Sequence, residues 1–224
     1  MKDEAAELLK EIEFLFEKYS DELRSSTQPY RLRRVASQMK NYSYHPDSEL
    51  VRESLMEHVG SLPMLAAAFY PHLKDSEVDL GKSLTMLAIH DIGELIEGDQ
   101  NTFLREDDGE KEEIAAKKLL SPIYHDIYND VEMQGSKSAK FAKSIDKIAP
   151  DIIDYLVPAE VTLWRFEHFN NLTTVEGIVQ LVIKHKRPYM LWNPFMTEFH
   201  KLLMSALELK LSDGLKAGKN WGEL

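Results

Sequence analysis

Residues 87–99 of the chain are Leu87-Ala88-Ile89-His90-Asp91-Ile92-Gly93-Glu94-Leu95-Ile96-Glu97-Gly98-Asp99. The stretch begins as the apolar centre of a helix and ends as a cluster of acids. A continuous helix would place His90 and Glu94 one turn apart on one face, with Asp91 beside His90. Burying an imidazole and carboxylates in an apolar surface is costly unless they are paired or bind a metal. The stretch therefore indicates a functional site.

Helical periodicity continues outward from this stretch in both directions. Apolar residues recur at three- and four-residue spacing, and alternating strand patterns and internal repeats are absent. Pro63 and Pro150 predict a kink or break within two of the helices. The segment 123–135 is ambiguous, with a short helix as one interpretation. We expect helices at residues 3–20, 49–70, 80–96, 110–120, 137–156, 158–170, 173–186 and 193–213. Because nothing resembles a flexible linker, we predict an all-α protein with a single domain over residues 1–224.

Composition narrows the class of protein. A net charge of −11 argues against binding of nucleic-acid polymers or anionic membranes. The absence of cysteine means that a metal site must use His, Asp and Glu. No stretch has the length of a membrane span or the pattern of a signal peptide, so we expect a soluble, cytoplasmic protein.

Four positions along the chain suit a metal ion. His58 lies on the apolar face of the helix expected at 49–70, His90 and Asp91 follow, and Asp146 lies between apolar residues of a later helix. Each alone has an ordinary explanation, as a core histidine, a chance pair or a surface acid. Together, two imidazoles and two carboxylates suit one divalent ion such as Mn²⁺, Co²⁺, Fe²⁺, Zn²⁺ or Mg²⁺. They would leave coordination positions open for water and substrate.

The same residues fall in an ordered series of motifs. In chain order these are Glu53-Ser54-Leu55-Met56-Glu57-His58, Ile89-His90-Asp91-Ile92-Gly93-Glu94, Glu97-Gly98-Asp99 and Ile145-Asp146-Lys147. The series resembles that of the HD-domain metal-dependent phosphohydrolases, most closely the small HD proteins that include bacterial 5'-deoxynucleotidases. The resemblance covers about residues 30–150. It implies an HD-domain helical bundle. The C-terminal third adds helices without a recognisable motif, and we expect the helix at 3–20 and the C-terminal helices at 158–213 to pack on the bundle.

The resemblance also implies roles for these side chains. His58, His90, Asp91 and Asp146 would bind one divalent metal. Glu94 would take the place of the family's acid near the nucleophilic water, and Asp99 that of its second catalytic acid. These roles are chemically consistent, because a carboxylate beside a metal-bound water can accept its proton and a second acid can protonate the leaving oxygen.

Phosphate binding needs positive charge beyond the metal. Arg34 or Arg33 resembles the family's arginine that precedes the first ligand, and we interpret Arg52 and Lys147 as surface charges. The related branch commonly has Trp after its arginine, where this chain has Val35. The preference between ribose and deoxyribose therefore stays open.

The leading hypothesis is a phosphomonoesterase acting on nucleoside 5'-monophosphates or a similar small phosphate. Two alternatives are a phosphodiesterase or pyrophosphohydrolase acting on a signalling nucleotide, and a catalytically silent, metal-binding regulatory protein. The resemblance implies a homodimer. The aromatic cluster of Tyr189, Trp192, Phe195 and Phe199 is interpreted as core or as a dimer interface.

Overall fold

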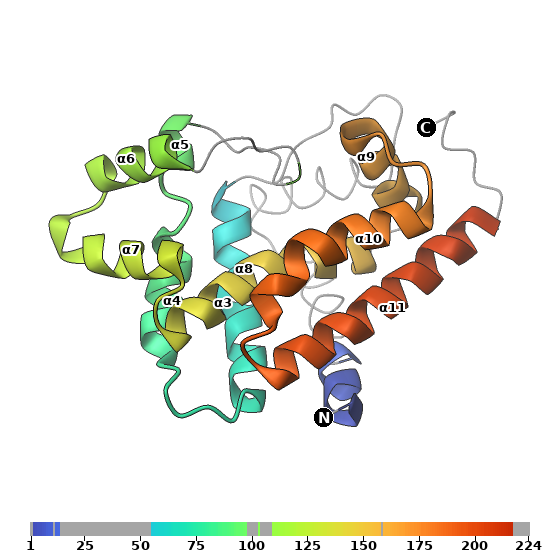
Figure 1. The fold of residues 1–224 in the computed structure, drawn as a ribbon, viewed down its shortest axis with the longest axis horizontal. Coiled ribbons are helices and arrows are strands. Elements are labelled where there is room, and N and C mark those ends of the chain that lie inside the picture. Colours follow the sequence, from blue (N-terminus) through green and yellow to red (C-terminus); the bar gives the residue numbers. More distant parts are fainter. Residues whose placement is uncertain are drawn as a thin grey trace, which may run out of the picture. The chain divides into compact units, whose positions relative to one another are not determined.

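The computed structural model describes residues 2–10, 12–13, 55–97, 103, 109–157 and 159–216. Within these ranges every regular element is a helix and no strand occurs, which confirms the all-α class (Figure 1). Residues 2–10 and 12–13 are helical, and the rest of the helix predicted at 3–20 lies outside the described ranges. None of the helices in this part of the chain combines the length and apolarity needed to cross a bilayer.

The helices follow the sequence pattern closely, often to within one or two residues. The segment 123–135 is a short helix with a 3-10 turn before it, and the predicted helix at 137–156 has the bounds expected. The elements are α3 (Leu55–Phe69), η1 (Tyr70–His72), α4 (Leu80–Ile89), α5 (Glu94–Glu97), α6 (Glu110–Leu119), η2 (Pro122–Tyr124), α7 (His125–Met133), α8 (Lys137–Leu156), α9 (Ala159–Asn170), α10 (Val175–Lys186), η3 (Arg187–Met190) and α11 (Pro194–Lys216).

The prediction of one continuous helix over 80–96 is wrong. The α4 helix ends at Ile89, and the chain turns before α5 begins at Glu94. In the turn the backbone hydrogen bonds join residues three apart instead of four. The amide of Glu94, for example, donates to the carbonyl of Asp91 at 3.0 Å. Gly93 lies in this turn, where a Cβ would lie 2.3 Å from the backbone oxygen of Glu112 on α6. The close approach of α6 therefore leaves room for glycine only, a tertiary contact that local periodicity does not encode.

The predicted breaks at the two internal prolines do not occur. Pro63 lies inside α3 and Pro150 lies inside α8, and both helices continue past them. A proline removes one backbone donor and crowds the preceding turn. Buried apolar residues follow each proline, namely Leu65 and Ala66 in α3 and Ile152 in α8. We infer that the burial of these residues offsets the free-energy cost of a proline inside the helix.

Contacts divide the chain into two compact units. Unit 1 comprises residues 1–53, 150–184 and 198–224, and unit 2 comprises residues 54–149 and 185–197. The single domain over 1–224 stays a prediction. In unit 1, Asp154 near the end of α8 is buried and pairs with Arg165 of α9. Lys210 of α11 donates to the carbonyls of Tyr155 and Val157, where a cation suits the C-terminal end of α8.

Unit 2 carries every described residue of the predicted metal site. Its core is formed by fully buried apolar residues of three helices, Leu62 and Phe69 of α3, Met86 and Leu87 of α4, and Ile145 and Ile148 of α8. A second cluster joins Ala116, Leu120 and Tyr128, with Ile89 and Ile92 packed against it. The residues on either side of His90 and Asp91 therefore pack against this second cluster.

Candidate metal centre

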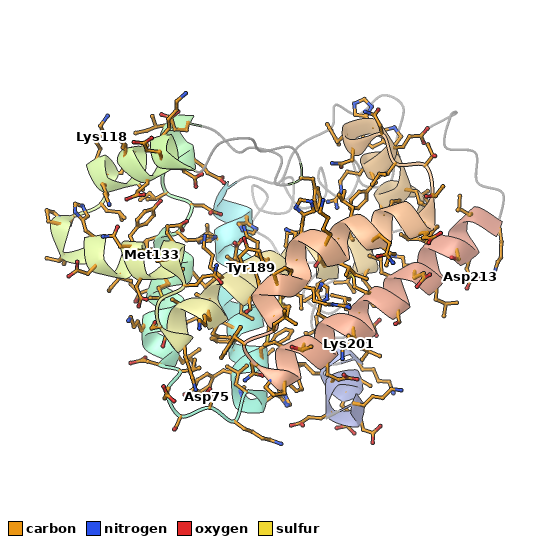
Figure 2. The ribbon with its side chains drawn as sticks, in the orientation of Figure 1. Asp75, Lys118, Met133, Tyr189, Lys201 and Asp213 are labelled. Carbon is orange, nitrogen blue, oxygen red and sulfur yellow. The ribbon has the colours of Figure 1, made fainter. Side chains whose placement is uncertain are left out.

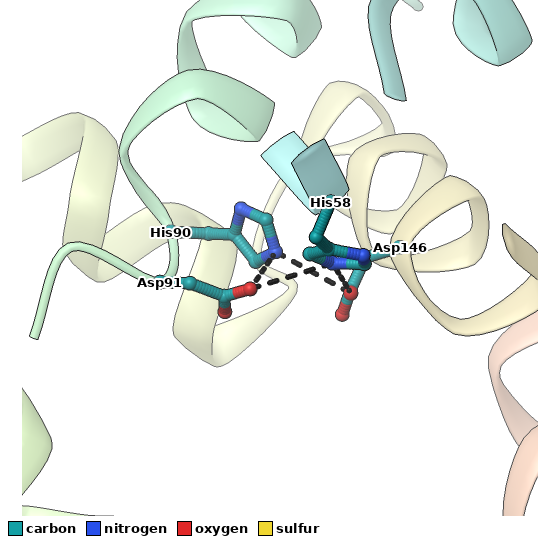
Figure 3. A group of neighbouring side chains, drawn as sticks. All are labelled: His58, His90, Asp91 and Asp146. Atoms are coloured by element: carbon teal, nitrogen blue, oxygen red, sulfur yellow. Dashed lines mark hydrogen bonds and ion pairs between the residues drawn. The ribbon is translucent and has the colours of Figure 1, made fainter. Parts of the chain in front are cut away.

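The four predicted ligands lie together in unit 2. His58 comes from the first turns of α3, His90 and Asp91 from the turn that follows α4, and Asp146 from the middle of α8. Figure 3 shows the four side chains pointing toward one another. One ligand atom from each lies within 4.8 Å of the others.

The distances within the quartet are short. His90 Nε2 lies 2.9 Å from Asp91 Oδ2 and 3.3 Å from Asp146 Oδ1. His58 Nε2 lies 3.4 Å from Asp91 Oδ2 and 3.3 Å from Asp146 Oδ1. His90 Nε2 makes two of these contacts, but neither is a hydrogen bond, and this buried atom has no hydrogen-bond partner in the described part of the chain. The two carboxylates alone therefore leave His90 Nε2 without a hydrogen bond.

These separations match a metal site. Ligand atoms about 2.1 Å from a common ion stand about 3.0 Å apart at a right angle and about 3.4 Å apart at a tetrahedral angle. The four measured contacts run from 2.9 to 3.4 Å. The arrangement thus suits lone pairs that converge on one point, and two nitrogen and two oxygen donors fit a divalent first-row ion or Mg²⁺.

The second nitrogen of His90 is also fixed. His90 Nδ1 lies 3.0 Å from the backbone oxygen of Leu87. With Nδ1 as the donor, Nε2 presents its lone pair to the quartet, as metal-binding histidines commonly do. The hydrogen bond forms because His90 follows the last turn of α4, where carbonyl groups have no helical donor.

Electrostatics favour a cation at this place. Burial opposes charge on His90, but Asp146 and Asp91 outweigh it and raise the pKa of His90 to about 10. Burial likewise opposes charge on Asp146, but Lys147, His90 and His58 hold its pKa well below the usual range. The carboxylates that attract a proton to the cluster would equally attract a divalent ion.

Lys147 corrects the sequence interpretation. The sequence pattern predicts a surface charge, yet the side chain of Lys147 is only 21% exposed and its Nζ lies 2.9 Å from Asp146 Oδ2. The pKa of Lys147 is raised, chiefly by the charge of Asp146. The pairing was invisible in the sequence, because neighbouring residues on a helix point in directions about 100° apart and do not ordinarily meet.

A second group of acids adjoins the quartet. Ligand atoms of Asp91, Glu94 and Glu112 lie within 4.8 Å of one another, and all three side chains are half-buried. Glu94 therefore lies beside Asp91 although the helix between them is interrupted. Glu112 comes from α6 and was not predicted, because it stands in a run of charged residues that does not distinguish it from its neighbours.

The remaining predicted site residues are not in the described ranges. Asp99, Arg33 and Arg34 lie outside them, as does Arg52. The roles that the sequence analysis gave to these residues stay predictions.

Comparison with known proteins agrees with the fold and the motifs. The model of the HD domain family matches residues 40–174. That range spans more than half of the chain and includes all four residues of the quartet. The chain therefore belongs to the HD domain family.

A solved structure gives an independent likeness in fold. It is the crystal structure of a predicted metal-dependent phosphohydrolase from Magnetospirillum magnetotacticum MS-1, with 22% sequence identity and a TM-score of 0.50. The match covers 83% of this chain and 94% of that protein. A comparison with curated proteins found no match.

Proposed function

We propose that the protein is a metal-dependent phosphohydrolase, and more specifically a phosphomonoesterase that acts on nucleoside 5'-monophosphates or a similar small phosphate. The convergence of His58, His90, Asp91 and Asp146, with Glu94 beside Asp91, carries the proposal. Membership of the HD domain family supports it, and so does the likeness in fold to a predicted metal-dependent phosphohydrolase.

In the proposed site, the quartet holds one divalent ion. Such an ion lowers the pKa of a bound water and polarises a phosphoryl oxygen. His90 is held by Leu87 in the orientation that presents Nε2. The half-buried carboxylate of Glu94, within 4.8 Å of Asp91, orients the attacking water and accepts its proton.

Residues outside the described ranges complete the proposal. Asp99 protonates the leaving oxygen, so that attack on phosphorus releases inorganic phosphate and a nucleoside. Arg34 or Arg33 binds the phosphate, for which a guanidinium is well shaped. We also propose that the protein is a homodimer.

Phosphate release tests the proposal directly. The protein is stripped with a chelator, reloaded separately with Mn²⁺, Co²⁺ and Mg²⁺, and given a panel of ribo- and deoxyribonucleoside 5'-monophosphates. We expect metal-dependent release of inorganic phosphate from at least part of the panel. The ratio of the ribo to the deoxyribo rates then defines the sugar preference that Val35 leaves open.

The panel also separates the alternatives. Turnover of cyclic or diphosphate nucleotides, with none of the monophosphates, would replace the phosphomonoesterase with a phosphodiesterase or pyrophosphohydrolase. If protein that holds a metal turned over none of these compounds, a catalytically silent regulatory protein would replace both.

A further inference from the structure

The two oxygens of the Asp146 carboxylate face different partners. Asp146 Oδ1 lies 3.3 Å from Nε2 of both His58 and His90. Asp146 Oδ2 lies 2.9 Å from Nζ of Lys147. One oxygen thus faces the imidazoles and the other faces an ammonium group.

The position of Lys147 is supported by η3. Lys147 Nζ lies 5.9 Å from the centre of the Tyr189 ring, within the range of a cation–π interaction. Tyr189 belongs to η3 and is labelled in Figure 2. The ring and the ammonium group therefore form a contact between η3 and the helix that carries Asp146.

A hydrogen-bonded latch holds η3 against α8. Ser144 is fully buried, and its Oγ lies 2.7 Å from the carbonyl oxygens of both Lys140 and Tyr189, which share its one hydroxyl hydrogen. The indole Nε1 of Trp192 donates to the same Oγ at 2.7 Å. Because Ser144 lies two residues before Asp146, the latch fixes η3 to the part of α8 that carries the ligand.

We propose that Lys147 is a positioning residue that limits Asp146 to a single ligand oxygen, with η3 holding the ammonium group in place. The inference rests on the proposed metal site. A carboxylate with two open oxygens can bind a cation through both. Asp146 Oδ2 has no hydrogen bond in the described part of the chain, and its contact there is the 2.9 Å ion pair with Lys147. This ion pair leaves Oδ1 as the oxygen that faces the imidazoles, and the ammonium group offsets the negative charge of Asp146.

A matched control lies on the same helix. Lys143, four residues before Lys147, has a side chain 12% exposed and pairs with Glu132 of α7 at 2.8 Å. It is a partly buried, ion-paired lysine on α8, as Lys147 is, but its partner is not a member of the quartet. A Lys143→Met protein therefore reports the general effect of removing such a lysine.

The test measures coordination and affinity rather than activity. Wild type, Lys147→Met and Lys143→Met proteins are loaded with Co²⁺, and the visible absorption is recorded, because its intensity falls as the coordination number rises. The Kd for Co²⁺ and for Mn²⁺ is measured by calorimetry. We expect Lys147→Met to weaken the Co²⁺ bands and to lower both Kd values about tenfold, since a repelling charge is removed.

The controls define what each result means. Lys143→Met is expected to keep the spectrum and Kd of the wild type, and Lys147→Arg is expected to keep both because the positive charge remains. Tyr189→Leu should change the Co²⁺ spectrum and the Kd in the same direction as Lys147→Met, but by a smaller amount. If Lys147→Met does not fold, Lys147→Gln replaces it, with circular dichroism as the check.

Unchanged spectra and Kd values in a folded Lys147→Met protein would overturn the inference while leaving the proposed metal site intact. A wild type that binds neither Co²⁺ nor Mn²⁺ would overturn both. The two failures are therefore distinguishable in one set of samples.

Discussion

Replacement of Gly93 by alanine tests the turn that separates α4 from α5. The new Cβ would lie 2.3 Å from the backbone oxygen of Glu112 and 2.8 Å from its Cγ. Since Cβ atoms essentially never approach another heavy atom within 3.0 Å, the turn and α6 must separate by at least 0.7 Å. The contact is with backbone, so a side-chain rotation cannot relieve it.

The expected cost follows from this displacement. Overpacking in a buried position lowers the free energy of unfolding by about 1–3 kcal/mol. For a chain of this size each kcal/mol corresponds to about 2–4 °C in Tm, so the Gly93→Ala protein should melt about 2–12 °C below the wild type. A displacement of this size beside Glu94 should also lower phosphate release, because about 1 Å of misplacement can reduce a rate about 100-fold.

Gly60 is the matched control. It is an exposed residue inside α3, and a Cβ there would meet no heavy atom of the described residues within 4 Å. Alanine is favoured over glycine in a helix by up to about 1 kcal/mol. Gly60→Ala should therefore melt slightly above the wild type in the same calorimetric scan. A Gly93→Ala protein that equals the wild type in Tm and activity would refute the packing argument.

Three further substitutions test the supports of unit 2. Asp79→Ala removes the carboxylate that accepts from the amide of Lys82 at 2.9 Å and caps α4, and urea unfolding should show a loss of about 1 kcal/mol. Ser144→Ala removes the acceptor of the indole of Trp192, and the same assay should show a loss of about 1–3 kcal/mol. Burial opposes charge on Asp130, but its bond with Lys82 prevails and lowers its pKa. The stability that Asp130 adds is therefore present above its unfolded pKa of about 3.9 and lost as pH falls through the folded value. Asp130→Asn should lose less stability than the wild type between about pH 5 and pH 3; equal losses would contradict the assignment.

Most helices could be predicted because each shows apolar residues at three- and four-residue spacing. The α8 helix shows this best, since its apolar face fixed both ends at Lys137 and Leu156. The helix over 80–96 could not be predicted correctly. At its interruption, Gly93 lies in close contact with Glu112 of α6, a residue far from it along the chain. Periodicity describes one element at a time and contains no record of such a contact.

The candidate site divides in the same way. The convergence of the four side chains of the quartet was predictable, because His and Asp residues on apolar helix faces are costly to bury unless they meet partners. Metal binding by the quartet stays a prediction. The positions of Lys147 and Glu112 were not predictable, because lysine and glutamate are common on helix surfaces. Only the packed structure shows that Lys147 meets Asp146 and that Glu112 meets Glu94.

Metal content is the most direct test of the central claim that the quartet binds a divalent ion. Wild type, His90→Ala, Asp146→Ala and Glu94→Ala proteins are stripped, reloaded with Mn²⁺ or Co²⁺, dialysed, and assayed for metal per chain by mass spectrometry. We predict one ion per chain in the wild type and in Glu94→Ala, and none in His90→Ala or Asp146→Ala. Full metal content in the His90→Ala and Asp146→Ala proteins would contradict the assignment of the site.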